Sequence, residues 1–226
     1  MPEPTSLPTP GERRDGGAPV APPRNVVLVP VKPPVVGKSR LGGLGPRQRT
    51  VLAEAFALDT IAACLATDTV AAVLVVTDDA GFSMRARALG ATAIPDGVSD
   101  DLNGTLRQAA AEAFRRWPEL RPVAVCADLP ALRPAELRAA LEAMTGPHPW
   151  FVPDAAGVGT TVYAAAYDEF DPRFGPGSCD AHLDAGARQV EAAASVRRDV
   201  DDLADLRDAL ALGLGPRTDE AAHGLS

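Results

Sequence analysis

Two lysines are candidate phosphate-binding residues because the rest of the chain has none. The sequence has 226 residues and 22 Lys and Arg side chains, yet its only lysines are Lys32 and Lys38. Arg40 and the glycines at 42 and 43 follow them closely. A lysine ammonium group on a flexible stem suits phosphate oxygens. We interpret this segment as a polyphosphate-binding loop; coincidence and a solvated basic loop are the alternatives.

A P-loop is the obvious competing interpretation, because residues 37–39 read GKS. The P-loop pattern G-x-x-x-x-G-K-[ST] requires a glycine where this chain has Lys32. Pro33 and Pro34 follow, and neither has the backbone N–H group that a phosphate-cradling turn needs. The pattern therefore disfavours a P-loop phosphotransferase.

Aspartates in two distant segments are candidate metal ligands. Asp128 is the first charge after the apolar run 122–127, and Asp199 and Asp201 are two positions apart, so on an extended strand they face the same side. Carboxylates of this kind hold Mg²⁺, which completes its shell with waters and phosphates. The alternatives are a turn aspartate before Pro130 and a helix N-cap within 199–202. We predict a shared Mg²⁺ site.

Two glycine-containing segments could bind a small anion. Residues 170–178 read FDPRFGPGS, where the Gly175 N–H, Ser178 and Arg173 could contact it, and 157–161 read GVGTT. Ordinary turn chemistry is the alternative for both. His182 follows the first segment and could reach the site. The three histidines form no metal pattern, and we find no Ser-His or Cys-His nucleophile pair.

Strand and helix patterns alternate along the chain and position these residues. Buried apolar runs alternating with helical spacing predict an α/β domain with a mostly parallel sheet. In such sheets ligands bind at the carboxyl ends of the strands, where the lysines and aspartates lie. We predict strands at 26–31, 71–77, 92–94, 122–128, 150–153, 160–166 and 195–200, and helices that include 181–193 and 201–212.

Composition limits the domain organisation and the class of partner. Residues 1–24 are rich in proline and predict a disordered tail, 25–214 one globular domain, and 215–226 a frayed C-terminal tail. A net charge of −8 without a long basic run argues against nucleic-acid binding. Three widely spaced cysteines fit a reducing cytoplasm, and there is no membrane-spanning apolar run.

With these segments in order, the chain resembles the guanylyltransferases of coenzyme F(420) biosynthesis, which attach GMP to 2-phospho-L-lactate or phosphoenolpyruvate. The resemblance spans 25–212 and implies the three-layer fold of nucleotide-diphospho-sugar transferases, with a mostly parallel seven-stranded sheet. The motifs that carry it are K-x₅-K-S-R-L (32–41), D-x-L-N (100–103), D-L-P (128–130), G-x-G-T (157–160), R-F-G-P-x-S (173–178) and D-V-D-x-x-x-D-L (199–206).

The resemblance also implies a role for each matching residue, with GTP as donor and Mg²⁺ as cofactor. The commonest final motif of the family, D-V-D-T-P, differs here because 202–203 are Asp-Leu, at positions that cap a helix. The implied roles are catalysis by Lys32, Lys38 and Asp128; nucleotide binding by Lys32, Lys38, Arg40 and Asn103; binding of the phosphorylated acid by Thr160, Gly175 and Ser178; and metal binding by Asp128, Asp199 and Asp201.

Other nucleotidyltransferases of the same fold are the main rivals. Molybdopterin guanylyltransferases and sugar-phosphate cytidylyltransferases usually open with L-x-G-G-x-S/G-x-R-M, which this sequence lacks. A non-catalytic nucleotide-binding member is disfavoured by the three carboxylates. Between the two acids, the Arg-, Ala- and Gly-rich composition suggests a GC-rich, actinobacterium-like source and favours phosphoenolpyruvate.

Overall fold

The computed structural model of the chain describes residues 24–32, 41, 43–98 and 101–224. The predicted tail over 1–24 therefore lies outside this range except for its last residue, and so do Lys38 and Arg40. None of the helices within the described ranges is long and apolar enough to cross a membrane.

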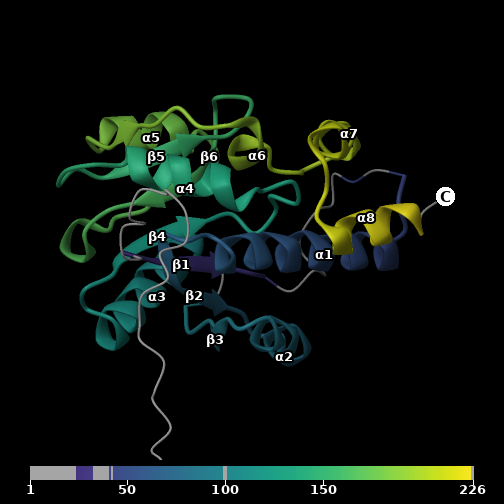
Figure 1. Cartoon of the computed structure of the whole chain (residues 1–226), viewed down its shortest axis with the longest axis horizontal. Coiled ribbons are helices and arrows are strands. Elements are labelled where there is room, and N and C mark those ends of the chain that lie inside the picture. Colours follow the sequence, from purple (N-terminus) through teal and green to yellow (C-terminus); the bar gives the residue numbers. More distant parts are fainter. Residues whose placement is uncertain (1–23, 33–40, 42, 99–100, 225–226) are drawn as a thin grey trace, which may run out of the picture.

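A seven-stranded mixed sheet forms the centre of the molecule (Figure 1), in the order β3-β2-β1-β4-β6-β5-β7. β1 pairs in parallel with β2 and β4, β2 with β3, and β5 with β7, whereas β6 runs antiparallel to both β4 and β5. The predicted, mostly parallel sheet is confirmed. The strands are β1 Asn25–Pro30, β2 Val70–Val76, β3 Thr92–Ile94, β4 Arg121–Val125, β5 Trp150–Pro153, β6 Thr160–Ala164 and β7 Arg188–Gln189.

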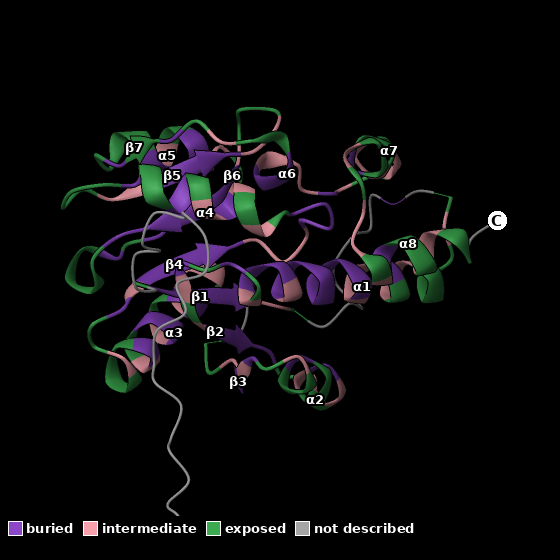
Figure 2. Cartoon of the chain, in the orientation of Figure 1, coloured by how far each residue is buried: buried purple, intermediate pink, exposed green. Residues whose placement is uncertain are grey.

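Helices cover both faces of the sheet and make the three layers. Alternate β1 residues point to opposite faces: Val27 and Val29 pack in the core with α1 Pro46–Leu65, α2 Ala80–Ala88, α4 Pro134–Ala143 and α6 Ala194–Arg197. Val26 and Leu28 pack on the other face with α3 Leu102–Arg116 and α5 Ser178–Asp184. Strands β1 and β4 are accordingly buried over almost their whole length (Figure 2).

The predicted strand at 195–200 is wrong. Residues 194–197 form the short helix α6, because the Thr161 hydroxyl donates to the Val196 carbonyl (2.8 Å) and the buried Ser195 hydroxyl bonds to Glu136. The seventh strand is instead β7, inside the segment predicted as a helix over 181–193, of which only α5, ending at Asp184, is helical.

The C-terminal segment is also more ordered than predicted. α7 spans Leu203–Leu212, and the predicted frayed tail contains helix α8, Pro216–His223, which lies along α1 (Figure 1). Asp59 of α1, which is 5% exposed, accepts hydrogen bonds from the backbone N–H groups of Thr218 (2.7 Å) and Arg217 (3.3 Å). This buried carboxylate caps α8 from a distant helix, as a negative charge at a helix N-terminus does.

Candidate functional site

Asp128 lies directly beyond β4, in a segment that helix α1 fixes. The Thr60 hydroxyl accepts from the Leu129 N–H (3.1 Å) and donates to the Phe56 (2.9 Å) and Ala127 (3.2 Å) carbonyls. Thr60 is fully buried, so these bonds are shielded from water. The Asp128 carboxylate is thus presented, half-buried, at the carboxyl end of the parallel strands.

The second acidic segment joins Asp128 through the backbone. The Val200 N–H donates to the Asp128 carbonyl at 3.0 Å, so Asp199 and Asp201 flank the contact. One oxygen from each of the three carboxylates lies within 4.8 Å of the others. Three like charges at this distance repel one another unless a cation binds between them, and carboxylate oxygens are what a hard divalent cation prefers. The cluster could therefore hold a metal ion, and these residues fit one.

A neighbouring aspartate, Asp202, has a structural role. Its Oδ1 accepts from the N–H groups of Ala204 (2.8 Å) and Asp205 (3.0 Å), which makes it the N-cap of α7. In return, Asp205 Oδ2 accepts from the N–H groups of Asp201 (3.1 Å) and Asp202 (3.2 Å). Arg198 bridges Asp205 (3.0 Å) and Asp208 (3.2 Å). This capping box holds the Asp199–Asp201 segment in place.

Lys32 is exposed and follows β1, the strand beside β4. The parallel register pairs Leu28 with Ala124, and Lys32 and Asp128 each lie four positions further along. The lysine and the aspartate thus belong to the same edge of the sheet. The predicted contributions of Lys38 and Arg40 fall outside the described residues.

The predicted acid-binding residues surround a loop beside this edge. Thr160 begins β6 and is 6% exposed, and Ser178, 2% exposed, begins α5. Because β6 is antiparallel to β4, its start meets the end of β4, where the Cys126 N–H donates to the Thr161 carbonyl (2.9 Å). Gly175, at φ +138°, accepts from the Ser178 N–H (3.1 Å) and shapes the 173–178 loop.

Asn103 lies at the same loop. Its Nδ2 donates to the Phe174 carbonyl (3.0 Å), and its Oδ1 accepts from the Phe174 N–H (2.8 Å). This pair of bonds fastens the loop to α3, next to the predicted acid-binding residues. The amide therefore positions the loop, a role that the resemblance, which implied nucleotide contact, did not indicate.

Sequence reasoning missed two supporting residues, Asp154 and Arg197, and indicated of His182 only that it could reach the site. Asp154 accepts from the Val158 (2.9 Å) and Gly159 (2.8 Å) N–H groups and so shapes the turn before Thr160; an aspartate ahead of a Gly-rich turn was the available signal. Arg197 clamps that turn by donating to the Asp154 carbonyl (2.8 Å). His182 is fully buried and bonds Thr160 through Nδ1 (3.0 Å).

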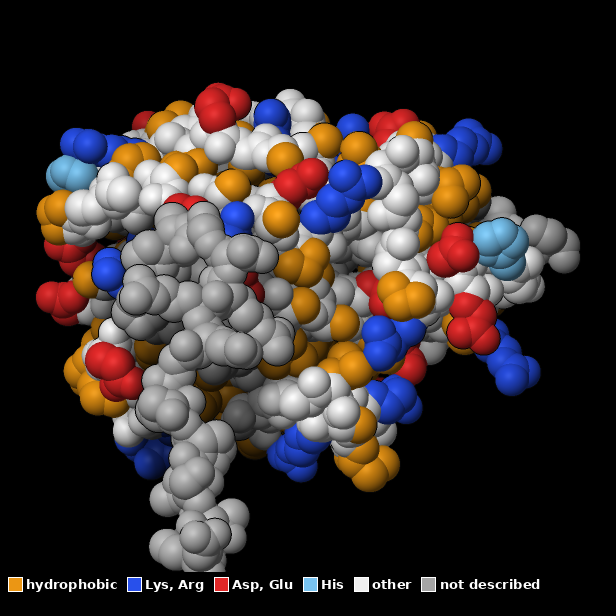
Figure 3. Space-filling model, in the orientation of Figure 1, with side chains coloured by type: hydrophobic (Ala, Val, Ile, Leu, Met, Phe, Trp, Pro, Cys, Tyr) orange, Lys and Arg blue, Asp and Glu red, His pale blue; other side chains and the backbone are white. Residues whose placement is uncertain are grey.

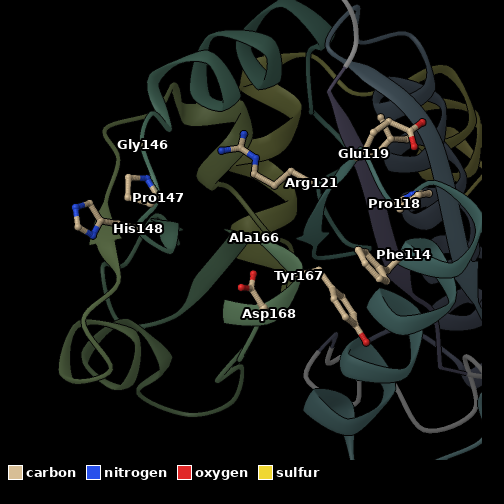
Figure 4. A pocket seen from close by; sticks show the side chains of 11 residues that line it. Phe114, Pro118, Glu119, Arg121, Gly146, Pro147, His148, Ala166, Tyr167 and Asp168 are labelled. Carbon is tan, nitrogen blue, oxygen red and sulfur yellow. The ribbon is translucent and has the colours of Figure 1, made fainter.

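A separate hollow of about 550 Å³ lies at the opposite edge of the sheet. Arg121, the first residue of β4, and Tyr167, beyond the end of β6, help to line it, and the Tyr167 ring stacks on Phe114 at 4.2 Å between centroids (Figure 4). Acidic and basic side chains are interspersed over the described part of the visible face (Figure 3). That mixture lacks the basic stripe of a nucleic-acid-binding surface.

Comparison with curated proteins finds close relatives over most of the chain, although no family model matches. Phosphoenolpyruvate guanylyltransferase of Thermomonospora curvata is 48% identical over 195 residues, covering 85% of this chain and 86% of the relative. The protein of the same name from Streptomyces scabiei is 47% identical over 207 residues, covering 88% and 96%. That of Rhodococcus opacus is 37% identical over 220 residues, covering 90% and 92%.

Solved structures share the fold at low sequence identity. 4-diphosphocytidyl-2C-methyl-D-erythritol synthase aligns with a TM-score of 0.59 at 13% identity, covering 84% of this chain and 98% of that one. A nucleotidyl transferase from Methanothermobacter thermautotroptrophicus aligns with a TM-score of 0.56 at 18% identity, covering 84% and 97%. A putative nucleotide-diphospho-sugar transferase from Desulfovibrio desulfuricans G20 aligns with a TM-score of 0.57 at 18% identity, covering 83% and 96%. The predicted α/β fold of this type is confirmed.

Proposed function

The chain belongs to the phosphoenolpyruvate guanylyltransferase family, and we propose from this that it transfers GMP from GTP to phosphoenolpyruvate, with release of pyrophosphate. The product is enolpyruvoyl-2-diphospho-5'-guanosine, a precursor for coenzyme F(420) in the cytoplasm. The observation that carries the proposal within the structure is the convergence of Asp128, Asp199 and Asp201 within 4.8 Å, at the sheet edge that also holds Lys32.

The reaction is a substitution at the α-phosphorus of GTP. An oxygen of the acid's phosphate forms a bond to that phosphorus, the bond to the β-phosphate bridging oxygen breaks, and pyrophosphate leaves with the electron pair. A phosphate monoester has its second pKa near ~6, so the attacking oxygen is ionised at neutral pH. The site consequently needs no general base, in agreement with the involvement of His182 in structural hydrogen bonds.

The obstacle is repulsion between two polyanions, and each group of residues reduces it differently. Asp128, Asp199 and Asp201 would hold Mg²⁺, which would supply charge neutralisation and alignment of the phosphates. Lys32, with Lys38 and Arg40 from the sequence motif, binds the triphosphate. Thr160, the Gly175 N–H and Ser178 hold the acid in line for attack.

A direct assay tests this proposal. The purified chain is incubated with Mg²⁺, one of GTP, ATP, CTP or UTP, and either phosphoenolpyruvate or 2-phospho-L-lactate, with mass detection of the product and measurement of pyrophosphate. We expect the guanylylated enolpyruvate from GTP and phosphoenolpyruvate. Preference for 2-phospho-L-lactate would change the acceptor, and release of GDP without pyrophosphate would refute nucleotidyl transfer.

A further inference from the structure

His182 lies in an aromatic cage beside the proposed acid-binding residues. The rings of Tyr163 and Phe151 stack against the imidazole at 4.8 and 5.4 Å between centroids, and Phe174 meets it edge-on at 5.6 Å. The side chain is fully buried, although histidine is polar. A buried imidazole is tolerated only when its nitrogens have hydrogen-bond partners, so those partners are informative.

The hydrogen-bond partners of the two ring nitrogens fix where the proton is. The backbone N–H of Arg173 donates to Nε2 at 3.0 Å, so Nε2 is an acceptor and carries no hydrogen. A neutral imidazole carries one N–H, which must then be on Nδ1. Nδ1 lies 3.0 Å from Thr160 Oγ1 and therefore donates to it.

The neutral form is the one that this environment favours. Burial lowers the pKa of His182 from 6.5 to about 4, and a hydrogen bond with the Ser178 backbone opposes this only in part. At neutral pH the ring is therefore neutral and carries one proton. Nε2 has no hydrogen and can accept from the Arg173 N–H.

The direction of these hydrogen bonds determines whether the Thr160 hydroxyl donates to a ligand or accepts from it. Its oxygen accepts from His182, so its own hydrogen has to point to another acceptor. No acceptor for that hydrogen is found within the residues that the structure describes. We infer that His182 is a positioning residue, which makes the Thr160 hydroxyl a donor toward an oxygen of the phosphorylated acid and holds the 173–178 loop in register with it.

This inference rests on the proposed function, because that function gives Thr160 an anionic ligand. The inference also predicts which acids the site prefers. With the reverse tautomer, the Thr160 hydroxyl would donate to His182 and turn only its lone pairs toward the acid, which an anion would repel. With Nδ1 protonated, the site favours acids that present an ionised oxygen at this point.

Two substitutions at His182 separate positioning from packing. His182→Phe keeps a ring within the cage and removes both nitrogens, whereas His182→Asn keeps a donor near the Nδ1 position. We expect His182→Phe to raise the KM for phosphoenolpyruvate roughly tenfold, as loss of one hydrogen bond to a charged group does, with the KM for GTP changed less than about twofold. His182→Asn should restore most of the loss.

Phe151→Leu is the matched control, because it disturbs the cage and leaves both hydrogen bonds in place. It should lower Tm and leave the KM for the acid within about twofold of wild type. Equal increases in both KM values in His182→Phe, or no rescue by Asn at matched Tm, would overturn the positioning role.

A nitrogen NMR measurement of the imidazole tautomer tests the same inference without turnover. In ¹⁵N-histidine-labelled protein, His182 should show a proton on Nδ1 only, unchanged from about pH 8 to 5, while the exposed His148 and His223 serve as internal references. A proton on Nε2 would overturn the inference even if the guanylylated acid forms. Failure of the wild type to make that product with Nδ1 protonated would instead refute the proposed function.

Discussion

The carboxyl and amino edges of the sheet arrange their charged side chains differently. At the carboxyl edge, Asp128, Asp199 and Asp201 bring like charges together. At the amino edge, beside the hollow of about 550 Å³, Arg121 directs its guanidinium to Asn25 Oδ1 (3.0 Å) and to the Met144 (2.8 Å) and Leu141 (3.3 Å) carbonyls. The first arrangement suits the binding of a divalent cation, whereas the second stabilises the fold. The proposed function therefore uses the carboxyl edge and not the hollow.

The largest expected effect is at the carboxyl edge. Asp128→Asn should reduce kcat by at least ~10³-fold, because it removes one charge of the proposed metal site. Its Tm should change little, since asparagine keeps the shape of the half-buried side chain. Steady-state kinetics and thermal unfolding measure the two effects.

Asp168→Asn is the matched control, because Asp168 is an exposed carboxylate that lines the amino-edge hollow. It should leave kcat within about twofold of wild type. Comparable losses of kcat in both variants would contradict the assignment of the chemistry to the carboxyl edge.

The next effect is a pH dependence of stability at the carboxyl edge. With the pKa of His182 lowered to about 4, the unfolded chain takes up a proton near pH 6.5 and the folded chain does not. Stability from this group is therefore complete above 6.5 and is lost as the pH falls toward 4, by up to about 3 kcal/mol. Urea unfolding should show a steeper decline between pH 6.5 and 4 in wild type than in His182→Phe. Parallel declines would mean that the imidazole is protonated in the folded chain.

Removal of the buried Asp59 carboxylate should lower the stability of the fold by a similar amount. Asp59→Ala leaves the Thr218 and Arg217 N–H groups without their acceptor, which should lower the free energy of unfolding by about 2–3 kcal/mol. α8 is preceded by Gly215, whose N–H donates to the Pro130 carbonyl (2.8 Å), two residues after Asp128. Asp219→Ala, at an exposed position of the same helix, should change stability by less than ~0.5 kcal/mol. Chemical denaturation measures both, and equal effects would contradict the capping role.

The smallest effect should come from the amino edge. Arg121→Met removes the bonds to the last carbonyls of α4 and should cost about 2 kcal/mol of unfolding free energy. Neither KM should change by more than about twofold. A KM for GTP raised tenfold would move nucleotide binding to this edge.

Strands β1 to β6 and the acidic residues were predictable because their signals are local. The apolar run at 26–31 is buried on both faces, and Asp128 follows the next strand in the sheet, so its position at the carboxyl edge followed from pattern alone. Asp199 and Asp201 lie beside Asp128 as predicted, although their segment is not a strand. The Val200 N–H bond and the capping box at Asp202 and Asp205 position them instead.

The features that sequence reasoning missed depend on distant partners. α8 was predicted to be frayed because nothing within 215–226 shows that Asp59 will cap it. The helix at 194–197 needs Thr161 and Glu136, and the cage around His182 draws its rings from β5, β6 and the 173–178 loop. Asn103 pairs with the backbone of Phe174, and an amide used in this way leaves no trace in local composition.

The central claim is that the three carboxylates bind one divalent cation for nucleotidyl transfer, and Mn²⁺ binding followed by electron paramagnetic resonance tests it directly. In the presence of GTP, wild type should bind one Mn²⁺ tightly at the carboxyl edge, and Asp128→Asn, Asp199→Asn and Asp201→Asn should each weaken it at least about tenfold. Mn²⁺ affinity that is unchanged in all three variants would contradict the account.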